Sequence, residues 1–136
     1  MRKGISLLIV LALFLAQGCV TKSAKITRQR VYSDITPQEL MQKIARGEKF
    51  ILLDVRSKGE YTWGHIKGAI LIPYTEIESR YGELGRKSRE IVVYCKSGHR
   101  SVTASKTLVR LGFYGVKNLS GGIEAWKRAG GEVVRD

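Results

Sequence analysis

The stretch IVVYCKSGHRS, which surrounds Cys95, restricts the possible folds more than any other part of the sequence. Residues 91–94 form a β-branched apolar run that predicts a short buried strand, although so short a run also fits a buried helix. The apolar residues within 101–111 recur at helical spacing, with Ser101 as the expected N-cap and Gly112 as the expected end. The stretch therefore predicts a strand, a tight loop and a helix, with a cysteine where the strand ends.

The predicted loop places Cys95 where its thiol is easily ionised. The first turn of a helix has unpaired backbone N–H groups and a partial positive charge, both of which stabilise an anion. Lys96 and Arg100 add two full positive charges, and Gly98 lets the loop curl so that successive N–H groups point inward. We expect the pKa of the thiol to lie below its ordinary value, which makes Cys95 a nucleophile near neutral pH. The alternative is a small buried apolar cysteine without a chemical role.

The length of the loop and its other residues limit the reactions that Cys95 can carry out. Cysteine-based phosphatases need the spacing C-x-x-x-x-x-R to wrap a phosphate, whereas only four residues separate Cys95 from Arg100 here. So tight a loop fits a smaller load, such as one extra sulfur carried by the cysteine. Ser97 and Ser101 either donate hydrogen bonds to this sulfur or serve as turn and cap residues. His99 either acts as a base or points outward into solvent.

A second loop follows another buried strand, predicted at residues 50–55 from a continuous apolar run that suits a parallel strand. In open α/β sheets, the loops at the carboxyl ends of the strands build the site. Asp54 is expected to support the site by accepting backbone hydrogen bonds. Arg56 either lines the mouth of the pocket and attracts anions or pairs with Glu60. His65, between two glycines, is expected to be a packed, hydrogen-bonded residue.

Helical and strand patterns alternate along the rest of the chain, and this alternation predicts an α/β fold. The segment TPQE, residues 36–39, forms a capping box with proline at the first helical position and opens a helix through Ala45. Further helices are expected at 76–81, 101–111 and 122–129, and further strands at 69–72 and 115–117. Neither histidine has the companions that a metal site requires, so no metal or other cofactor is predicted.

The N-terminus has the pattern of an export signal. Arg2 and Lys3 precede an apolar segment, residues 5–16, that is too short to span a bilayer comfortably. The letters LAQGC, ending at Cys19, resemble a bacterial lipobox, which predicts a lipoprotein-type signal peptide at 1–18 and a lipid on Cys19. The alternatives are an ordinary signal peptide cut nearby or a retained anchor helix. Each of the three exports the domain, so we expect a membrane-anchored lipoprotein facing the periplasm or the cell exterior.

The charge of the chain favours anionic partners. Lys and Arg outnumber Asp and Glu by 24 to 12, and the net charge of +12 is spread through the sequence. No basic stripe with interleaved aromatic residues and no nucleic-acid motif is present, which argues against nucleic acid. Residues 19–30 form a basic linker after the signal, and residues 31–136 have the size of one domain. Small anionic substrates or an acidic membrane surface account for the charge. If Cys19 carries lipid, Cys95 is the only free thiol and no intramolecular disulfide can form.

Five segments of the chain, in this order, resemble the successive motifs of the single-domain rhodanese family: LLDVR, then Glu60 and Tyr61, then GHIKGAILIP, YCKSGHRS and LSGGIEAWKRAGG. The resemblance covers nearly all of residues 31–136. It implies one rhodanese-like domain of the α/β class, with a central parallel sheet of about five strands flanked by helices on both faces. It also implies a cysteine that accepts a sulfane sulfur, with the persulfide held by loop N–H groups. Trp126, in the last segment, is expected to pack in the core.

The function that this resemblance implies is transfer of a sulfane sulfur from thiosulfate or a related donor to cyanide or a thiol, through a persulfide on the catalytic Cys95. The residues expected to bind the substrate or support the site are Lys96, Ser97, Gly98, His99, Arg100 and Arg56, with Asp54 and Ser101 in the supporting role. The alternative is an exported sulfur carrier or protein-interaction module with little turnover, whose partner would be a sulfur-relay protein. A phosphatase or an arsenate reductase is a more distant alternative, because the loop is short.

Overall fold

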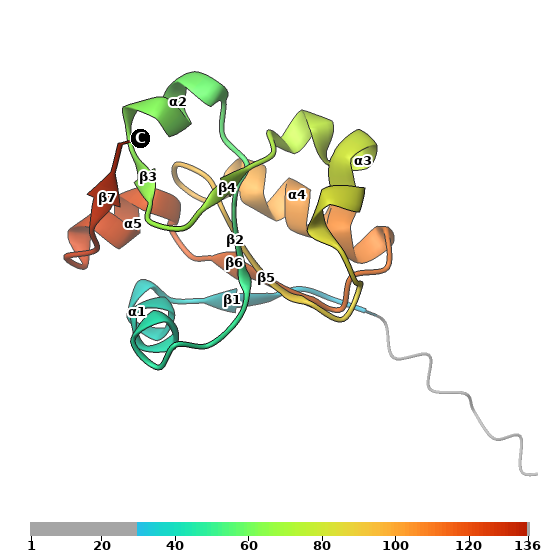
Figure 1. Ribbon diagram of the computed structural model, residues 1–136, viewed down its shortest axis with the longest axis horizontal. Helices are drawn as coiled ribbons and strands as arrows, with labels where there is room; N and C mark the ends of the chain where they lie inside the picture. The colour runs from blue at the N-terminus through green and yellow to red at the C-terminus, as the bar shows by residue number, and fades with distance from the viewer. Residues whose placement is uncertain (1–29, 136) are drawn as a thin grey trace, which may run out of the picture.

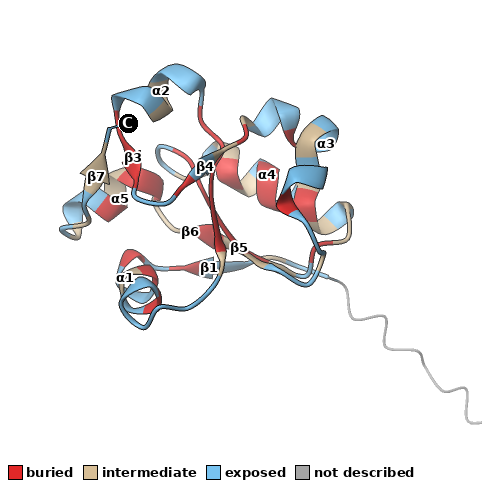
Figure 2. Cartoon of the chain, in the orientation of Figure 1, coloured by how far each residue is buried: buried red, intermediate tan, exposed pale blue. Residues whose placement is uncertain are grey.

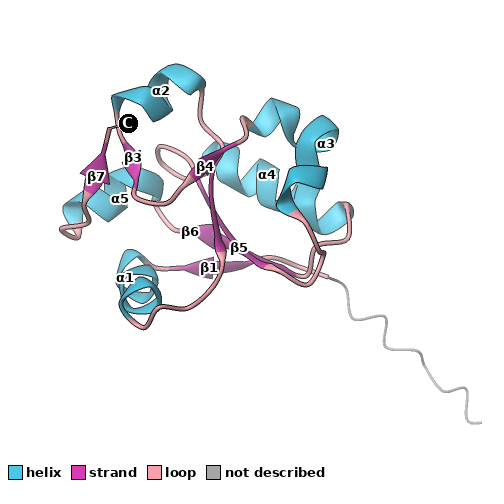
Figure 3. Ribbon diagram, in the orientation of Figure 1, coloured by secondary structure: helices cyan, strands magenta, loops and turns pink. Residues whose placement is uncertain are grey.

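The computed structural model describes residues 30–135 and has the predicted α/β architecture (Figure 1, Figure 3). The strands are β1 (Ser33–Ile35), β2 (Ile51–Asp54), β3 (His65–Ile66), β4 (Ile70–Leu71), β5 (Glu90–Tyr94), β6 (Gly115–Leu119) and β7 (Val133–Val134). The helices are α1 (Pro37–Ala45), α2 (Lys58–Trp63), α3 (Ile77–Arg80), α4 (His99–Arg110) and α5 (Gly122–Arg128), with the 3-10 turns η1 (Tyr74–Glu76) and η2 (Tyr81–Leu84) on either side of α3.

The predicted signal peptide, the predicted lipid site at Cys19 and most of the basic linker lie outside the described residues. Within residues 30–135, no helix has the length and the apolar character needed to cross a bilayer.

Five strands form one parallel sheet in the order β1-β6-β5-β2-β4. The central pair, β2 and β5, aligns Asp54 with Tyr94, so these two strands end together at one edge of the sheet. The chain continues past this edge as Val55, whose N–H donates to the carbonyl of Tyr94 at 3.0 Å, and as the cysteine loop, residues 95–100. The register therefore brings the two loops that the sequence singled out side by side.

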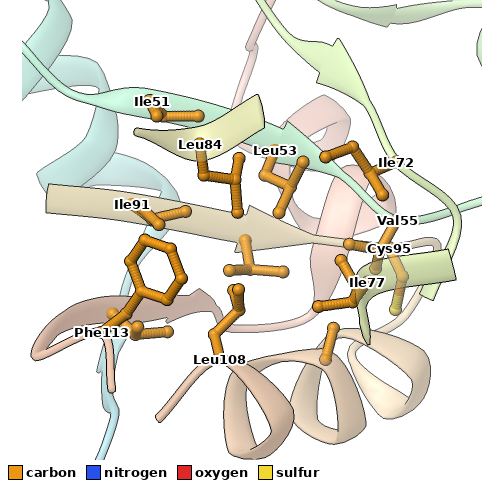
Figure 4. Close-up of a cluster of buried hydrophobic side chains, with 13 residues drawn as sticks. Ile51, Leu53, Val55, Ile72, Ile77, Leu84, Ile91, Cys95, Leu108 and Phe113 are labelled. Atoms are coloured by element: carbon orange, nitrogen blue, oxygen red, sulfur yellow. The ribbon is translucent and has the colours of Figure 1, made fainter. Parts of the chain in front are cut away.

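Consecutive residues of β2 and β5 are buried (Figure 2). Since neighbouring residues of a strand point to opposite sides of the sheet, both faces of these central strands are covered. Leu53 and Val93 pack with Leu108 of α4 in one apolar cluster, which Figure 4 shows between the sheet and the helix. Leu52 packs with Trp126 of α5 in a second cluster on the other face. These clusters confirm the parallel sheet covered on both faces, and they confirm that Trp126 packs in the core.

The two predicted helix starts have different outcomes. At α1 the prediction is confirmed: the hydroxyl of Thr36 accepts the N–H of Glu39 at 3.1 Å, and the Glu39 carboxylate accepts the N–H of Thr36 at 2.8 Å. At α4 the predicted cap is wrong, because the helix begins at His99, directly after Gly98 with φ +116°. Ser101 consequently lies in the first turn, where its hydroxyl donates to the carbonyl of Gly98 at 3.1 Å.

The structure contains elements that the sequence pattern did not predict. Helix α2 has its own capping box, in which the N–H of Glu60 donates to the Ser57 hydroxyl at 3.2 Å and the Glu60 carboxylate accepts the N–H of Ser57 at 3.0 Å. Strand β1 and the antiparallel pair β3–β7 are too short to leave a periodic apolar pattern. The helix predicted at 76–81 is the four-residue α3 between two 3-10 turns.

The first residues of α5 form backbone hydrogen bonds with the cysteine loop. The N–H of Ile123 donates to the carbonyl of Cys95 at 2.9 Å, and the N–H of Glu124 donates to the carbonyl of Lys96 at 3.1 Å. Gly122 permits this close approach, because a Cβ at this position would lie 2.5 Å from each of these carbonyl oxygens. The first turn of α5 therefore fixes the backbone that carries the thiol.

Replacing Gly122 by alanine tests this contact. Gly122→Ala should lower the free energy of unfolding by about 2–5 kcal/mol, because the alanine must adopt φ +62° and its methyl group must displace the loop. Gly130→Ala is the matched control: its φ of +87° imposes similar backbone strain, but nothing lies within 4 Å of the added Cβ. It should cost only about 1–2 kcal/mol in a urea denaturation measurement. Equal losses in the two variants would show that the packing of α5 on the loop contributes nothing.

Candidate active site

The thiol of Cys95 lies on the inner side of the cysteine loop and is only 1% exposed. The N–H of Gly98 donates to its Sγ at 3.1 Å, and the hydroxyl oxygen of Ser101 lies 3.4 Å from Sγ. Both contacts come from the junction of loop and helix, which curls around the sulfur because Gly98 adopts a positive φ. The loop therefore directs polar groups at a single sulfur atom.

The pKa of the Cys95 thiol is lowered below its ordinary value even though the group is buried. Burial alone would raise the pKa, because it disfavours the charged thiolate. The Ser101 hydroxyl, which accepts from the thiol and can turn from the Gly98 carbonyl to donate to a thiolate, and the backbone N–H groups of Ser101, Gly98 and Ser97 stabilise the thiolate and outweigh burial. The lowered pKa that the sequence predicts is thus present, and neutral hydrogen-bond donors are its main cause.

The two cations of the cysteine loop are each paired with a carboxylate. The guanidinium of Arg100 forms two hydrogen bonds of 2.8 Å to the two oxygens of Glu60. The ammonium of Lys96 is largely exposed and lies 3.8 Å from the carboxylate of Glu124. The charge effect expected of these cations on the thiol is therefore subordinate to the hydrogen bonds described above.

Glu60 ties α2 to the start of α4. Its carboxylate accepts hydrogen bonds from Arg100 and from both the N–H and the hydroxyl of Ser57. The hydrogen bond from Arg100, with those from Ser57, outweighs partial burial and lowers the pKa of Glu60 to about 2. Glu60 is therefore ionised at every pH at which a thiolate forms, and it neutralises Arg100 throughout that range.

Asp54 and Arg56 form a second ion pair, which is buried at the end of β2. The carboxylate of Asp54 accepts the N–H of Arg56 at 3.0 Å and the guanidinium of Arg56 at 2.7 Å. The same guanidinium donates to the carbonyl of Gly64 at 2.7 Å and so holds the loop after α2. Of the two predicted roles for Arg56, pairing with Glu60 is wrong, because Asp54 is the closer carboxylate along the chain. Arg56 does line a pocket, as described next.

An open cavity of about 300 Å³ lies beside the cysteine loop. Its lining residues come from the loop after β2, from α2, from the cysteine loop and from α5: Arg56, Glu60, Trp63, Gly64, Lys96, Ile123, Glu124 and Lys127. The indole of Trp63 is 75% exposed at this cavity, with the guanidinium of Arg135 5.5 Å from its ring centre. The cavity thus combines an exposed indole with three cations, Arg56, Lys96 and Lys127, and two carboxylates, Glu60 and Glu124, so the charge of its lining is slightly positive and favours a small anion.

The other predicted site residues lie at the surface or in the core. Ser97 and His99 are exposed in the cysteine loop, so the outward orientation considered for His99 is the one observed. His65 is buried, stacks on the ring of Tyr61 with centroids 3.8 Å apart, and its Nδ1 lies 2.9 Å from the carbonyl of Tyr61. Within residues 30–135, no group of three or more potential metal ligands occurs.

Three features of the site escaped sequence reasoning. The pairing of Glu60 with Arg100 joins residues forty positions apart, which no local pattern reveals. Trp63 lies in the second loop that the sequence singles out, but no pattern shows that its indole lines a cavity. The contact of Gly122 with the cysteine loop had one signal, the double glycine after β6, because such a pair often permits a close backbone approach.

Comparison with known proteins agrees with this geometry. Residues 36–129 match the model of the rhodanese-like domain family. A sulfurtransferase of Allochromatium vinosum is 38% identical over 102 residues, which cover 75% of this chain and 94% of that protein. Thiosulfate sulfurtransferase 16 of Arabidopsis thaliana is 33% identical over 116 residues, covering 74% of this chain and 92% of that protein. Some other relatives are longer, and the chain spans only 25% to 50% of them.

Solved structures show the same likeness. The rhodanese-like domain of an Anabaena protein superposes with a TM-score of 0.72 at 33% identity, and the match covers 78% of this chain and 81% of that structure. The relatives named as sulfurtransferases support sulfur transfer of the rhodanese type. By its family match and by its relatives, this chain belongs to the rhodanese-like domain family.

Proposed function

We propose that this protein is a sulfurtransferase that carries a sulfane sulfur as a persulfide on Cys95, with thiosulfate or a related anion as donor and cyanide or a thiol as acceptor. The observation that carries the proposal is the buried thiol with a lowered pKa, held by the N–H of Gly98 and the hydroxyl of Ser101. Such a thiolate is nucleophilic near neutral pH. The loop is too short to wrap a phosphate, so phosphatase chemistry is not supported.

In the first step, the Cys95 thiolate attacks the outer sulfur of thiosulfate. A new S–S bond forms to Sγ, the S–S bond of thiosulfate breaks, and sulfite leaves with the bonding electron pair. The total charge of reactants and products is the same, and the negative charge moves to the terminal sulfur of the persulfide. Backbone N–H groups of Ser97 and Gly98, which already lower the pKa of the thiol, are positioned to stabilise this charge.

In the second step, cyanide or a thiolate attacks the terminal sulfur of the persulfide. The S–S bond to Sγ breaks, the acceptor leaves as thiocyanate or as a new persulfide, and the Cys95 thiolate is restored. The same hydrogen bonds that stabilise the resting thiolate make it a good leaving group. No metal or other cofactor takes part in either step as we propose it.

We propose that the donor and the acceptor bind in the cavity beside the cysteine loop, which is lined by Lys96, the neighbour of Cys95 in the sequence. Lys127 is exposed at this cavity and forms no ion pair with another described residue, and the pair of Lys96 with Glu124 is exposed and long at 3.8 Å, so both lysines can attract a divalent anion such as thiosulfate. Arg100 and Arg56 contribute less charge than the sequence suggests, because each is paired with a carboxylate. We assign Arg56 and Asp54 to the support of the cavity wall and Arg100 to the fixed start of α4.

We further propose that the protein is exported and held at a membrane by lipid on Cys19, facing the periplasm or the cell exterior. The support for this proposal is the basic and apolar N-terminal sequence followed by LAQGC. Mass spectrometry of the mature N-terminus tests it. A cleaved, diacylated Cys19 is the expected result, and an unprocessed Met1 would contradict it.

Replacing the thiol tests the covalent step. Cys95→Ser should abolish sulfur transfer from thiosulfate and leave the free energy of unfolding nearly unchanged, because the hydroxyl fits the same space but is not ionised near neutral pH. The wild-type Cys95 peptide should gain the mass of one sulfur after incubation with thiosulfate. Activity that survives in the serine variant would refute the persulfide. Stoichiometric loading of wild type without turnover on free cyanide or thiol would identify a sulfur carrier instead.

Replacing Ser101 tests the origin of the lowered pKa. Ser101→Ala removes a hydrogen bond to the thiolate, so it should raise the pKa of Cys95 and slow sulfur loading near neutral pH by about tenfold. The matched control is Ser105→Ala, one turn later in α4, whose buried hydroxyl has no hydrogen-bond partner among the described residues. Titration of the thiol by ultraviolet absorbance should shift only in the Ser101 variant, with loading recovered at higher pH. Identical titrations would locate the cause elsewhere.

A further inference from the structure

A basic face lies at the end of the sheet opposite the cysteine loop. It is formed by the start of the described chain and the segments that lead into β5 and β6, which lie side by side in Figure 1, and by the segment that leads into β2, which lines one cavity with residues 85–90. We call this surface the basic end face, and its members are the cations Arg30, Lys49, Arg86, Lys87 and Arg89 with the tyrosines Tyr81 and Tyr114. Both tyrosines are exposed, Tyr114 by 59%.

Contacts join four members of this face, and the other three, Lys49, Arg86 and Arg89, line one cavity beside them. The guanidinium of Arg30 donates to the carbonyl of Gly112 at 3.1 Å and lies 6.0 Å from the ring centre of Tyr114. The ammonium of Lys87 lies 4.1 Å from the ring centre of Tyr81. Tyr114, before β6, and Tyr81, before β5, therefore hold the cations of Arg30 and Lys87 by cation–π contacts.

The positive charges of the basic end face are not compensated by neighbouring carboxylates, unlike those of Arg56 and Arg100 near the thiol. Within residues 30–135, none of the five forms an ion pair with a carboxylate. The acidic residues closest to them in the sequence, Glu48 and Glu90, are already bound by Lys43, and Glu90 also by Lys117. Five cations on one small surface repel one another, so an anionic partner would stabilise them.

The position of this face in the chain indicates which anionic partner it meets. The described chain begins at Arg30 on this face, so the preceding sequence is joined to it here (Figure 1). That preceding sequence contains Lys22, Lys25 and Arg28 and, before them, Cys19, the proposed lipid site. A lipid chain on Cys19 would insert in the bilayer, and basic residues next to such an anchor bind anionic headgroups, so this step rests on the proposed lipid anchor.

We propose that the basic end face binds the surface of an anionic phospholipid bilayer. The guanidinium and ammonium groups contact the lipid phosphates, and the exposed tyrosines lie at the level of the headgroups, which is the part of a bilayer that tyrosine prefers. Strand β5 starts at Glu90 beside this face, and its five residues span about 17 Å before Cys95. The protein thus lies on the bilayer with its cysteine loop directed away from the lipid, toward dissolved sulfur compounds.

Hydrogen–deuterium exchange of the full chain with vesicles tests the proposal. Vesicles of phosphatidylcholine with a large fraction of phosphatidylglycerol should protect the peptides around 81–90 and 111–116, and pure phosphatidylcholine vesicles should not. Raising the salt to 1 M should remove the protection, because screening then acts over about 3 Å. The double variant Arg86→Glu/Arg89→Glu should weaken the protection by at least tenfold in lipid concentration, since each charge contributes roughly fivefold to binding.

The matched control is Lys58→Glu/Lys67→Glu. It changes the net charge by the same amount, at exposed residues in α2 and directly after β3. It should bind anionic vesicles as wild type does. Equal protection by neutral vesicles, or equal weakening by both double variants, would overturn the proposal. Protection of the same peptides by single-stranded RNA but not by anionic vesicles would also overturn it and would assign the face to nucleic acid.

Discussion

The structure depends on the parallel pairing of β2 with β5. This pairing aligns Asp54 with Tyr94, so that two chain segments leave the sheet at one edge and in one direction. One segment carries the buried ion pair of Asp54 and Arg56, and the other carries the thiol of Cys95. A shift of this register by one residue would turn one of the two strands over, since side chains alternate between the faces of a sheet, and the two loops would no longer leave the sheet together. The apolar residues that specify the fold therefore also position the reactive group.

The environment of the thiol shows why neutral donors suit sulfur transfer. The N–H of Gly98, with the other hydrogen bonds of the loop, stabilises a thiolate without placing a full positive charge beside it. The guanidinium of Arg100 is paired with Glu60, so it fixes the first turn of α4 instead of adding an uncompensated positive charge to the cysteine loop.

Local patterns in the sequence predicted the features that local physics controls. The strand before Cys95, the capping box at Thr36 and the α/β class all follow from short runs of residues, and the structure contains them. The cap of α4 was misplaced because Gly98 and Ser101 both suit a helix start, and only the curl of the loop around the sulfur decides between them. The partners of Arg56 and Arg100 could not be predicted from spacing, since the choice among several carboxylates is made by the tertiary fold.

The distribution of charge separates the two ends of the domain. Around the cysteine loop, Arg56 and Arg100 are paired with carboxylates, so little net charge remains beyond the exposed lysines of the cavity. At the basic end face, Arg86 and Arg89 have no such partner among the described residues. The parallel sheet lies between these two surfaces and holds them about one strand length apart. Because their charges act over a Debye length of about 8 Å, a lipid surface at one end leaves the electrostatics of the thiol at the other end almost unchanged.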